Sequence, residues 1–548
     1  MAFKTEAKPK KVTIENDGYC IDCSEQVSES NEKQNAVSDD VKKGSLEETI
    51  KNFLDEFLNN YSFFKGINTG KIYVTWEKYK NVWQTNIVDS DDFKAELREL
   101  LEYYIDSNKI YSDNKLKTIV GYLLDKVRLS KKEKWVYTRV AYRDESIYYN
   151  LNDSKSQTVK ISDNGCTVVS AKHFFDEYFV MYSTTSMGAQ KKPVEENDGR
   201  SLMDLFKPYI NLKESEQILL VVTIMTWFIA DIPKPVIVLL GGQGTGKTTL
   251  SRMIKMIVDP SDYDAFTMPK SKEDLSVALA NNYLLTIDNV SVLPKESSDL
   301  LCSAVTGASS ITRTLFTNNE VSIVTFQNAL LINGITISNF KPDFYDRSIL
   351  FEMERLQGEY KLTQEFIDNF KSDLPRILGE IFNTLEKAIK LHKNLPVSGN
   401  YRMADYAHWG RAISKVLFDN ENVFLNAYNE NRQAVSQYVL DENPVASVLE
   451  SKLKTFFDNK IEGFSCSKLT YGKIYEDTPT NLLRELENET QKPNLTYALR
   501  SPNWPKTPQE LSLQLKRLKE DFVDLGYLID IGNKKNGKRY ITITKVKS

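Results

Sequence analysis

The chain has 548 residues, 41% apolar and 27% charged, and a formal net charge of −4, which is typical of an ordinary soluble protein of several domains. Five cysteines in so long a chain exclude a disulfide scaffold and suit a reducing, cytoplasmic compartment. No secretory signal begins the sequence, and the longest apolar run (218–230) is too short to span a bilayer, so we expect a buried helix there and no membrane partner.

The first 45 residues are polar, contain few aromatic residues and show no periodicity, which predicts a disordered tail. Within this tail, Cys20 and Cys23 have the C-x-x-C spacing that could supply half of a tetrahedral zinc site. No nearby Cys or His completes the set of ligands, so a zinc site and a tail without a metal both remain open.

Residues 46–195 form a predicted accessory region that is first helical and then β. Apolar residues recur at helical spacing within 48–130, as in "DDFKAELRELLEYYIDS". From 134 to 170, "WVYTRVAYRDESIYYNLN" and "QTVKISDNGCTVVS" alternate as strands do. His173 has no ligand-like neighbours and is interpreted as structural, and the composition of 183–200 predicts a linker.

The segment "PVIVLLGGQGTGKTTLSRMIKMIV" (235–258) predicts a nucleotide-binding site. A short apolar run suits a strand buried on both faces, and the glycines let the following loop point its N–H groups at a phosphate. The N-terminus of the next helix faces the same anion. We expect Lys247 to reach the β- and γ-phosphates of ATP and Thr248 to hold Mg²⁺. The predicted nucleotide-binding residues are Gly241, Gly242, Gln243, Gly244, Thr245, Gly246, Lys247, Thr248 and Thr249.

A carboxylate at the end of a neighbouring strand should complete the Mg²⁺ site. The apolar run in "NNYLLTIDNVSVLP" ends in Asp288, which is the predicted metal ligand beside Thr248. Asn289 follows, where many related ATPases carry a Glu that polarises the attacking water. Because an amide cannot act as a general base, another group must orient the water if hydrolysis is fast.

Two further strands offer polar residues to the same site. The strand "NALLINGIT" (328–336) contains Asn333, which could bond the γ-phosphate or the lytic water, or could simply cap a turn. The strand "RSILFEM" (347–353) begins with Arg347. This arginine could reach a nucleotide on a neighbouring subunit, or could form a surface ion pair with Asp343 or Asp346.

Between Asp288 and Asn333, two β-prone runs, "TRTLF" and "VSIVTF", flank the polar turn "TNNE" and predict an inserted hairpin over 312–326. A simple nucleotide-binding domain does not need such a hairpin. Its tip, Asn318 and Asn319, and the flanking Arg313 are the predicted contacts to single-stranded DNA, although the uncharged tip leaves this assignment open.

The order "GGQGTGKTT", "YLLTIDNVS", "RTLFTNNE", "ALLINGI", "FYDRSILFEM" and "YRMADYAHWGRAI" resembles the MCM-like AAA+ replicative helicases and initiators of Gram-positive mobile genetic elements. These include the Rep proteins of staphylococcal pathogenicity islands and the helicases of cassette chromosome elements. The resemblance covers roughly residues 130–415. It implies an α/β fold with an AAA+ P-loop ATPase core at 196–430 and a hexameric ring that hydrolyses ATP and unwinds DNA. It also implies that Arg347 acts in trans, that the hairpin touches DNA, and that Arg402 or Arg411 serves as a second arginine sensor.

The last segment, 440–548, has the outline of a winged-helix domain. "PKTPQELSLQLKRLKEDFVDLGYL" opens with Thr507 as helix cap, Pro508 at the first helical position and Glu510 three residues after the cap. "YLIDIG", "NKKNGKR" and "YITITK" then predict strand, turn and strand. The residues expected on the apolar face of the helix are Leu511, Leu513, Leu515, Leu518 and Phe522.

From Lys516 to Ser548 nine Lys or Arg stand against four Asp or Glu, an excess expected of a surface that binds DNA phosphates. A winged helix that contacts protein instead is the alternative. The predicted DNA-binding residues here are Lys516, Arg517, Lys519, Lys534, Lys535, Lys538 and Arg539.

The sequence therefore predicts an ATP-dependent hexameric helicase and replication initiator that binds single- and double-stranded DNA, with Lys247, Asp288, Asn289, Asn333 and Arg347 as its catalytic residues. The alternative is an ATP-dependent DNA-binding switch that assembles on DNA without translocating. A primase fused into the N-terminal half has no support from closely spaced carboxylates.

Overall fold

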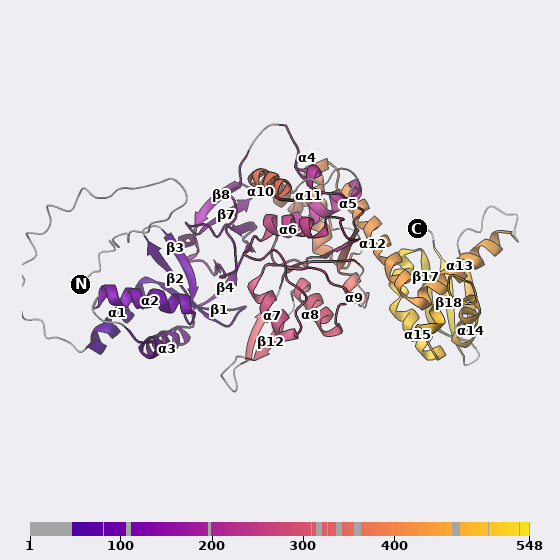
Figure 1. The fold of residues 1–548 in the computed structure, drawn as a ribbon, viewed down its shortest axis with the longest axis horizontal. Coiled ribbons are helices and arrows are strands. Elements are labelled where there is room, and N and C mark those ends of the chain that lie inside the picture. Colours follow the sequence, from indigo (N-terminus) through magenta and orange to yellow (C-terminus); the bar gives the residue numbers. More distant parts are fainter. Residues whose placement is uncertain are drawn as a thin grey trace, which may run out of the picture. The chain divides into compact units, whose positions relative to one another are not determined.

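A computed structural model describes residues 46–546, except for 80–81, 106–110, 196–198, 308, 314–320, 326, 336–341, 356–362, 398, 400, 463–471, 502 and 536–537 (Figure 1). The predicted disordered tail, with Cys20 and Cys23, lies outside these residues, as does the predicted hairpin tip at Asn318 and Asn319. The chain forms two compact units. The first takes in residues up to Tyr137 with Asp153–Thr158 and Val169–Ser183, and the second takes in Thr138–Asn152, Val159–Val168 and Thr184–Ser548.

The first unit is a five-stranded sheet with three helices packed on it. The strand order is β3-β2-β1-β4-β9. The strands are β1 (Ser62–Gly66), β2 (Ile72–Tyr79), β3 (Val82–Ile87), β4 (Glu133–Tyr137) and β9 (Phe179–Met181), and the helices are α1 (Leu46–Asn60), α2 (Asp91–Tyr104) and α3 (Asp113–Ser130).

The expectation that 48–130 is helical throughout is wrong for residues 62–87, which form β1, β2 and β3. The reason is visible in β2, where Ile72, Val74 and Trp76 alternate with their neighbours and pack into the same core as the helices. This is a period of two rather than 3.6. The tight turn before it, closed by a hydrogen bond from Gly70 N–H to the Gly66 carbonyl, joins β1 to β2.

The strands predicted between 134 and 170 are confirmed. Four of them, β5 (Val140–Arg143), β6 (Ser146–Asn150), β7 (Gln157–Ser162) and β8 (Gly165–Ser170), form a sheet in that order. All of β5 and β6, and most of β7 and β8, belong to the second unit.

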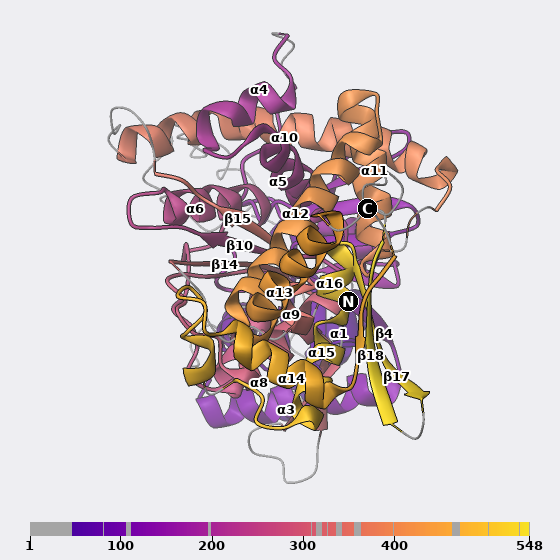
Figure 2. The same cartoon turned by 90° about the vertical axis from the view of Figure 1, so that its right-hand side faces the viewer.

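A parallel sheet ordered β11-β14-β10-β15 lies at the centre of the second unit, with helices on both faces (Figures 1 and 2). Nearly every residue of its strands is buried, which is why they read as continuous apolar runs. The strands expected around Asp288, Asn333 and Arg347 are confirmed. The strands are β10 (Val236–Leu240), β11 (Leu284–Ile287), β14 (Ala329–Gly334) and β15 (Ser348–Glu352), and the helices that lie between them in the sequence are α6 (Lys247–Val258), α7 (Lys272–Asn281), α8 (Lys295–Thr306) and α9 (Pro342–Tyr345).

The apolar run at 218–230 is the buried helix α5 (Glu214–Thr226), as expected. It packs against α11 (Ala404–Phe418) and α12 (Asn422–Glu442), and α10 (Thr363–Asn394) packs against α11 and the short α4 (Leu202–Phe206) (Figure 2). Among the described residues, no helix is long and apolar enough to cross a membrane.

The inserted hairpin is confirmed by an antiparallel pair of strands, β12 (Ser309–Arg313) and β13 (Val321–Thr325).

The C-terminal segment places helices beside a three-stranded sheet ordered β16-β18-β17. Thr507 caps α15, and its hydroxyl accepts from the Glu510 N–H at 3.2 Å. The predicted single helix breaks at Leu518 into two, and Leu513, expected on the apolar face, is 52% exposed because it lies on the opposite side of α15. The elements are α13 (Pro444–Glu462), β16 (Gly472–Asp477), α14 (Pro479–Glu489), α15 (Pro508–Arg517), α16 (Lys519–Asp524), β17 (Tyr527–Lys535) and β18 (Lys538–Lys545).

Candidate nucleotide site and nucleic-acid interface

The loop between β10 and α6 is curled by glycines in the left-handed region. Gly241, Gly244 and Gly246 have φ values of 148°, 78° and 84°. At Gly241 a side chain is also excluded by space, because its Cβ would lie 2.5 Å from the Met353 carbonyl oxygen. A loop curled in this way at the start of a helix has the shape that suits an anion.

Lys247, the first residue of α6, points back over this loop. Its Nζ donates to the carbonyls of Gly241 and Gly242, each at 2.7 Å, and lies 3.3 Å from the Thr245 hydroxyl. Burial lowers the pKa of Lys247, and the charge of Asp288 opposes this effect. An ammonium held only by neutral oxygens can take an anionic oxygen in their place, so the lysine fits a phosphate group.

Thr248 and Asp288 face each other across the end of β11. The Thr248 Oγ1 and the Asp288 Oδ1 are 3.5 Å apart. A hydroxyl and a carboxylate at this separation are the hard oxygen ligands that Mg²⁺ takes together with nucleotide phosphates. The donor set fits the ion that the sequence predicts.

Asn333 links the loop after β11 to α6 through two hydrogen bonds, and we call it a brace for this reason. Its Oδ1 accepts from the Asn289 N–H at 2.9 Å, and its Nδ2 donates to the Ser251 Oγ at 3.1 Å. Ser251 in turn donates to the Lys247 carbonyl at 2.9 Å. Asn333 is 1% exposed, so in this structure both ends of its amide are satisfied within the protein. Asn289 has φ 56°, a left-handed conformation that Asn tolerates better than most residues.

The structure thus brings together Lys247, Thr248, Asp288, Asn289 and Asn333 at the carboxyl edge of the parallel sheet. Arg347 makes its contacts elsewhere. It forms an ion pair with Asp343, and its Nη1 donates to the Asp343 carbonyl at 2.8 Å. Arg402 pairs with both Asp343 and Asp346.

Arg411 and the two histidines near it have packing roles. The Arg411 side chain is 3% exposed and donates to the Pro396 carbonyl and to Glu421. The His408 Nε2 lies 3.1 Å from the His392 carbonyl oxygen. His392 stacks on Trp409 with ring centroids 3.8 Å apart, and burial, with a smaller effect of His408, lowers its pKa to about 4.

A charged cluster that the sequence did not reveal holds the far end of α6. Arg139, fully buried, donates to Asp259 at 2.9 Å and to the carbonyls of Gly188 and Pro260. Asp259 also pairs with Lys255 at 3.0 Å and accepts from the backbone N–H of Leu284 in β11 at 3.0 Å. The opposite charges hold the pKa of the Asp259 carboxyl below its ordinary value although burial acts against them.

The last carbonyls of α6 are capped by side chains from upstream of the phosphate loop. Gln190 donates to the carbonyls of Met256 and Ile257, and the Tyr149 hydroxyl donates to the Val258 carbonyl at 3.1 Å. A helix end needs such partners when it is buried. No spacing in the sequence relates Tyr149 or Gln190 to α6, so only the fold could show this role.

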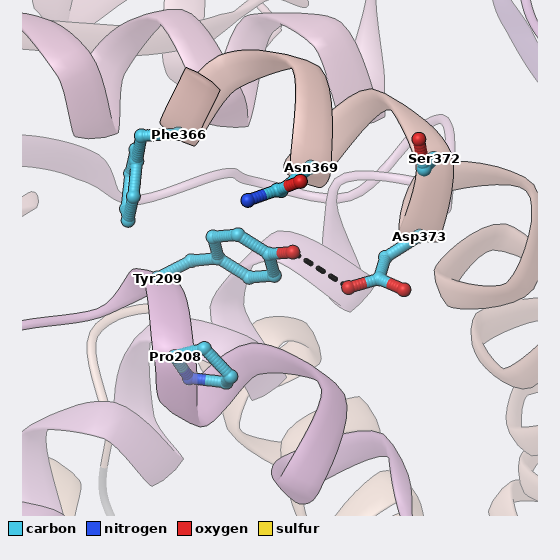
Figure 3. A pocket seen from close by; sticks show the side chains of 6 residues that line it. All are labelled: Pro208, Tyr209, Phe366, Asn369, Ser372 and Asp373. Atoms are coloured by element: carbon cyan, nitrogen blue, oxygen red, sulfur yellow. Dashed lines mark hydrogen bonds between the residues drawn. The ribbon is translucent and has the colours of Figure 1, made fainter. Parts of the chain in front are cut away.

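A hollow of about 300 Å³ lies between the segment after α4 and the start of α10 (Figure 3). Tyr209 occupies its middle, and its hydroxyl donates to Asp373 Oδ2 at 2.6 Å. Burial raises the pKa of Tyr209, and the hydrogen bond and negative charge of Asp373 raise it further. The hollow contains none of the residues predicted from the sequence. Its other lining residues are Pro208, Phe366, Asn369 and Ser372.

Of the predicted DNA-binding residues, Lys516, Arg517 and Lys519 are exposed on α15 and at the start of α16. Arg539 is exposed on β18. Arg313, Lys534, Lys535 and Lys538 lie within described strands, but their side chains are outside the described part of the structure, as are Asn318 and Asn319.

Two family models match the chain. Residues 203–428 match the actinomycete integrative conjugative element replication protein, and residues 466–548 match the AICE RepA C-terminal domain. No curated protein matches.

Among solved structures, two of the NrS-1 C-terminal region are similar over 91% of this chain and 98% of theirs, at 12% and 13% identity and a TM-score of 0.35. An inhibitor-bound JCV helicase is similar over 39% of this chain and 64% of that chain, at 14% identity and a TM-score of 0.23. The two family models describe parts of one kind of protein, so over these two segments the chain is similar to the replication proteins of actinomycete integrative conjugative elements.

Proposed function

We propose that this replication protein is an ATP-dependent DNA helicase and replication initiator, built on an AAA+ P-loop core that assembles into a hexameric ring. The observation that carries the proposal is the gathering of Lys247, Thr248 and Asp288 at the carboxyl edge of the parallel sheet, within the family-matched segment 203–428. Ligands of open α/β sheets bind at this edge.

Each residue has a role that its contacts support. Lys247 exchanges the carbonyls of Gly241 and Gly242 for phosphate oxygens. Thr248 and Asp288 hold Mg²⁺, which when bound neutralises charge on the phosphates. Asn333 fixes the loop after β11 against α6 through Ser251. Arg347 reaches a nucleotide on the adjacent subunit, releasing Asp343 when it does so.

DNA contacts are proposed for two places outside the nucleotide site. The hairpin β12–β13 interrupts the path between β11 and β14, so its movement can follow the state of the nucleotide. In the C-terminal segment, α14 and α15 followed by the ribbon β17–β18 suit a winged helix that binds double-stranded DNA. The exposed Lys516, Arg517 and Lys519 give it a basic surface.

The test is strand separation of a labelled forked DNA by the full chain with ATP and Mg²⁺. Lys247→Ala should lose nucleotide binding and separation together, whereas Lys295→Ala, an exposed lysine on α8, should retain both. Separation by Lys247→Ala at the wild-type rate would refute the proposal.

The second candidate is an ATP-dependent switch that assembles on DNA and does not translocate. The observation that favours it is Asn289, an amide where a general base is expected, whose N–H is bonded to Asn333. This candidate predicts ATP-dependent DNA binding by the wild type without strand separation.

A further inference from the structure

The connection between α14 and α15 exposes two large apolar side chains that are two residues apart in the sequence. Tyr497 is 51% exposed and Leu499 is 49% exposed, while Ala498 between them is fully buried. Single exposed apolar residues are common on protein surfaces. Here two of them lie on one short turn.

The backbone of this turn is held by regular hydrogen bonds, so the two exposed side chains do not lie on an irregular loop. Successive i→i+3 hydrogen bonds run from Ala498 N–H to Leu495, from Arg500 N–H to Tyr497 and from Trp504 N–H to Ser501, each at 3.1 Å. Leu495, Ala498 and Trp504 are buried in the core of the second unit. The backbone of the turn is therefore already ordered, and binding a partner through Tyr497 and Leu499 costs little backbone conformational entropy.

The positive charges in the sequence around this turn favour a negatively charged partner. Between Thr490 and Lys519 the sequence has six Lys or Arg and a single acidic residue, Glu510. Within the described part of the chain, five of the six cations make no ion pair: Arg500, Lys506, Lys516, Arg517 and Lys519.

The turn and α15 are joined by a hydrogen bond from Gln514 Nε2 to the Asn503 carbonyl at 2.8 Å. Unpaired cations in the same segment as two exposed apolar side chains suit a polyanion that also offers flat apolar surfaces. Nucleic acid has both, in its phosphates and in its bases.

We propose that Tyr497 and Leu499 form an apolar wedge that contacts the base steps of duplex DNA while the neighbouring cations bind its phosphates. Apolar side chains inserted between base steps are a recurring mode of duplex binding. The inference rests on the proposed DNA-binding function of the C-terminal segment and adds to it residues that contact bases without any charge.

The experiment measures the affinity of the full chain for a mixed-sequence duplex as a function of salt concentration. Tyr497→Ala and Leu499→Ala should each weaken binding about tenfold and leave the slope of log K against log salt unchanged, since neither residue releases a counterion. Arg500→Ala should instead reduce that slope by about one. Tyr497→Phe should bind like the wild type.

Tyr263→Ala is the matched control, because Tyr263 is 57% exposed and lies outside the C-terminal segment. Its affinity should equal that of the wild type. Wild-type affinity of both Tyr497→Ala and Leu499→Ala would overturn the wedge and leave DNA binding by this segment intact. A wild-type chain that binds no duplex would overturn the proposed DNA binding and the wedge together.

Discussion

Ser251 shows how the proposed nucleotide site depends on a residue that no motif marks. Its Oγ donates to the Lys247 carbonyl one turn earlier and accepts from Asn333, so it joins the phosphate loop to the loop that carries Asn289. The glycine-lysine-threonine pattern and the strand-ending Asp288 could be predicted from the sequence, because each needs only local spacing. The Ser251–Asn333 bond could not, because its partners are 82 residues apart.

Ser251→Ala should therefore lower the rate of ATP hydrolysis roughly tenfold with little change in nucleotide affinity. The reason is that the Asn333 Nδ2 loses its acceptor, and an unsatisfied buried donor costs about 1–3 kcal/mol. Asn333 then holds the Asn289 loop less firmly, whereas the side chains of Lys247 and Thr248 keep their contacts. Steady-state hydrolysis and nucleotide titration measure the two effects separately.

Ser276→Ala is the matched control, since Ser276 on α7 is also buried and its hydroxyl also donates to a carbonyl one turn earlier. It should change neither quantity. A Ser251→Ala protein with weakened nucleotide binding and an unchanged maximal rate would contradict the role of Asn333 as a brace.

At the scale of elements, the strands of the parallel sheet could be predicted because burial on both faces makes them continuous apolar runs. The strands β1 to β3 were missed because helices with strong 3.6-residue periodicity stand on either side of them. The break between α15 and α16 at Leu518 was missed for a different reason. Leu518 and Phe522 are both buried and continue the apolar pattern across the break.

The short helix α16 carries a carboxyl whose ionisation opposes folding. Asp521 is 7% exposed, and burial, with Asp346 and Asp524 adding to it, raises its pKa to about 7 from 3.8. Because the folded pKa is above the unfolded one, the stabilising contribution of the protonated form is full below the unfolded pKa and is lost as the pH rises through 7.

Asp521→Asn should therefore raise the midpoint of thermal unfolding by several degrees at about pH 8 and by less at about pH 5. Glu520→Gln, the exposed neighbour, should shift the midpoint little at either pH. Thermal unfolding followed by circular dichroism across this range measures the difference. A gain that is equal at both ends of the range would show that Asp521 is ionised in the folded protein.

At the scale of the whole molecule, the sequence resemblance to replication proteins of mobile elements is confirmed by the family models, while the ring, the helicase activity and the domain boundaries stay predictions. What the sequence could not show is that the unit with the proposed nucleotide site begins well before the glycine-rich loop. Arg139 and Asp259 are 120 residues apart in the sequence. Because both side chains are buried, either charge left without the other would be strongly destabilising.

This arrangement predicts how the chain can be shortened. A fragment of residues 196–548, which starts where the sequence suggests an ATPase domain, removes Arg139, Tyr149 and Gln190. Asp259 then loses one of its two charged partners, and the last carbonyls of α6 lose their caps. Removing one partner of a buried charge pair costs about 3–5 kcal/mol, so we expect this fragment to unfold at lower temperature and to bind ATP weakly.

A fragment of residues 138–548 keeps all three residues and provides the comparison, since both fragments lack the first 137 residues. It should unfold at a higher temperature and bind nucleotide more tightly than the shorter fragment. Arg139→Met in the full chain should reproduce most of the loss, because it removes the charge that faces Asp259 while leaving every segment in place. If 196–548 matched 138–548 in both measurements, the end of α6 would be stable without its upstream partners, and the buried cluster would have no bearing on the nucleotide site.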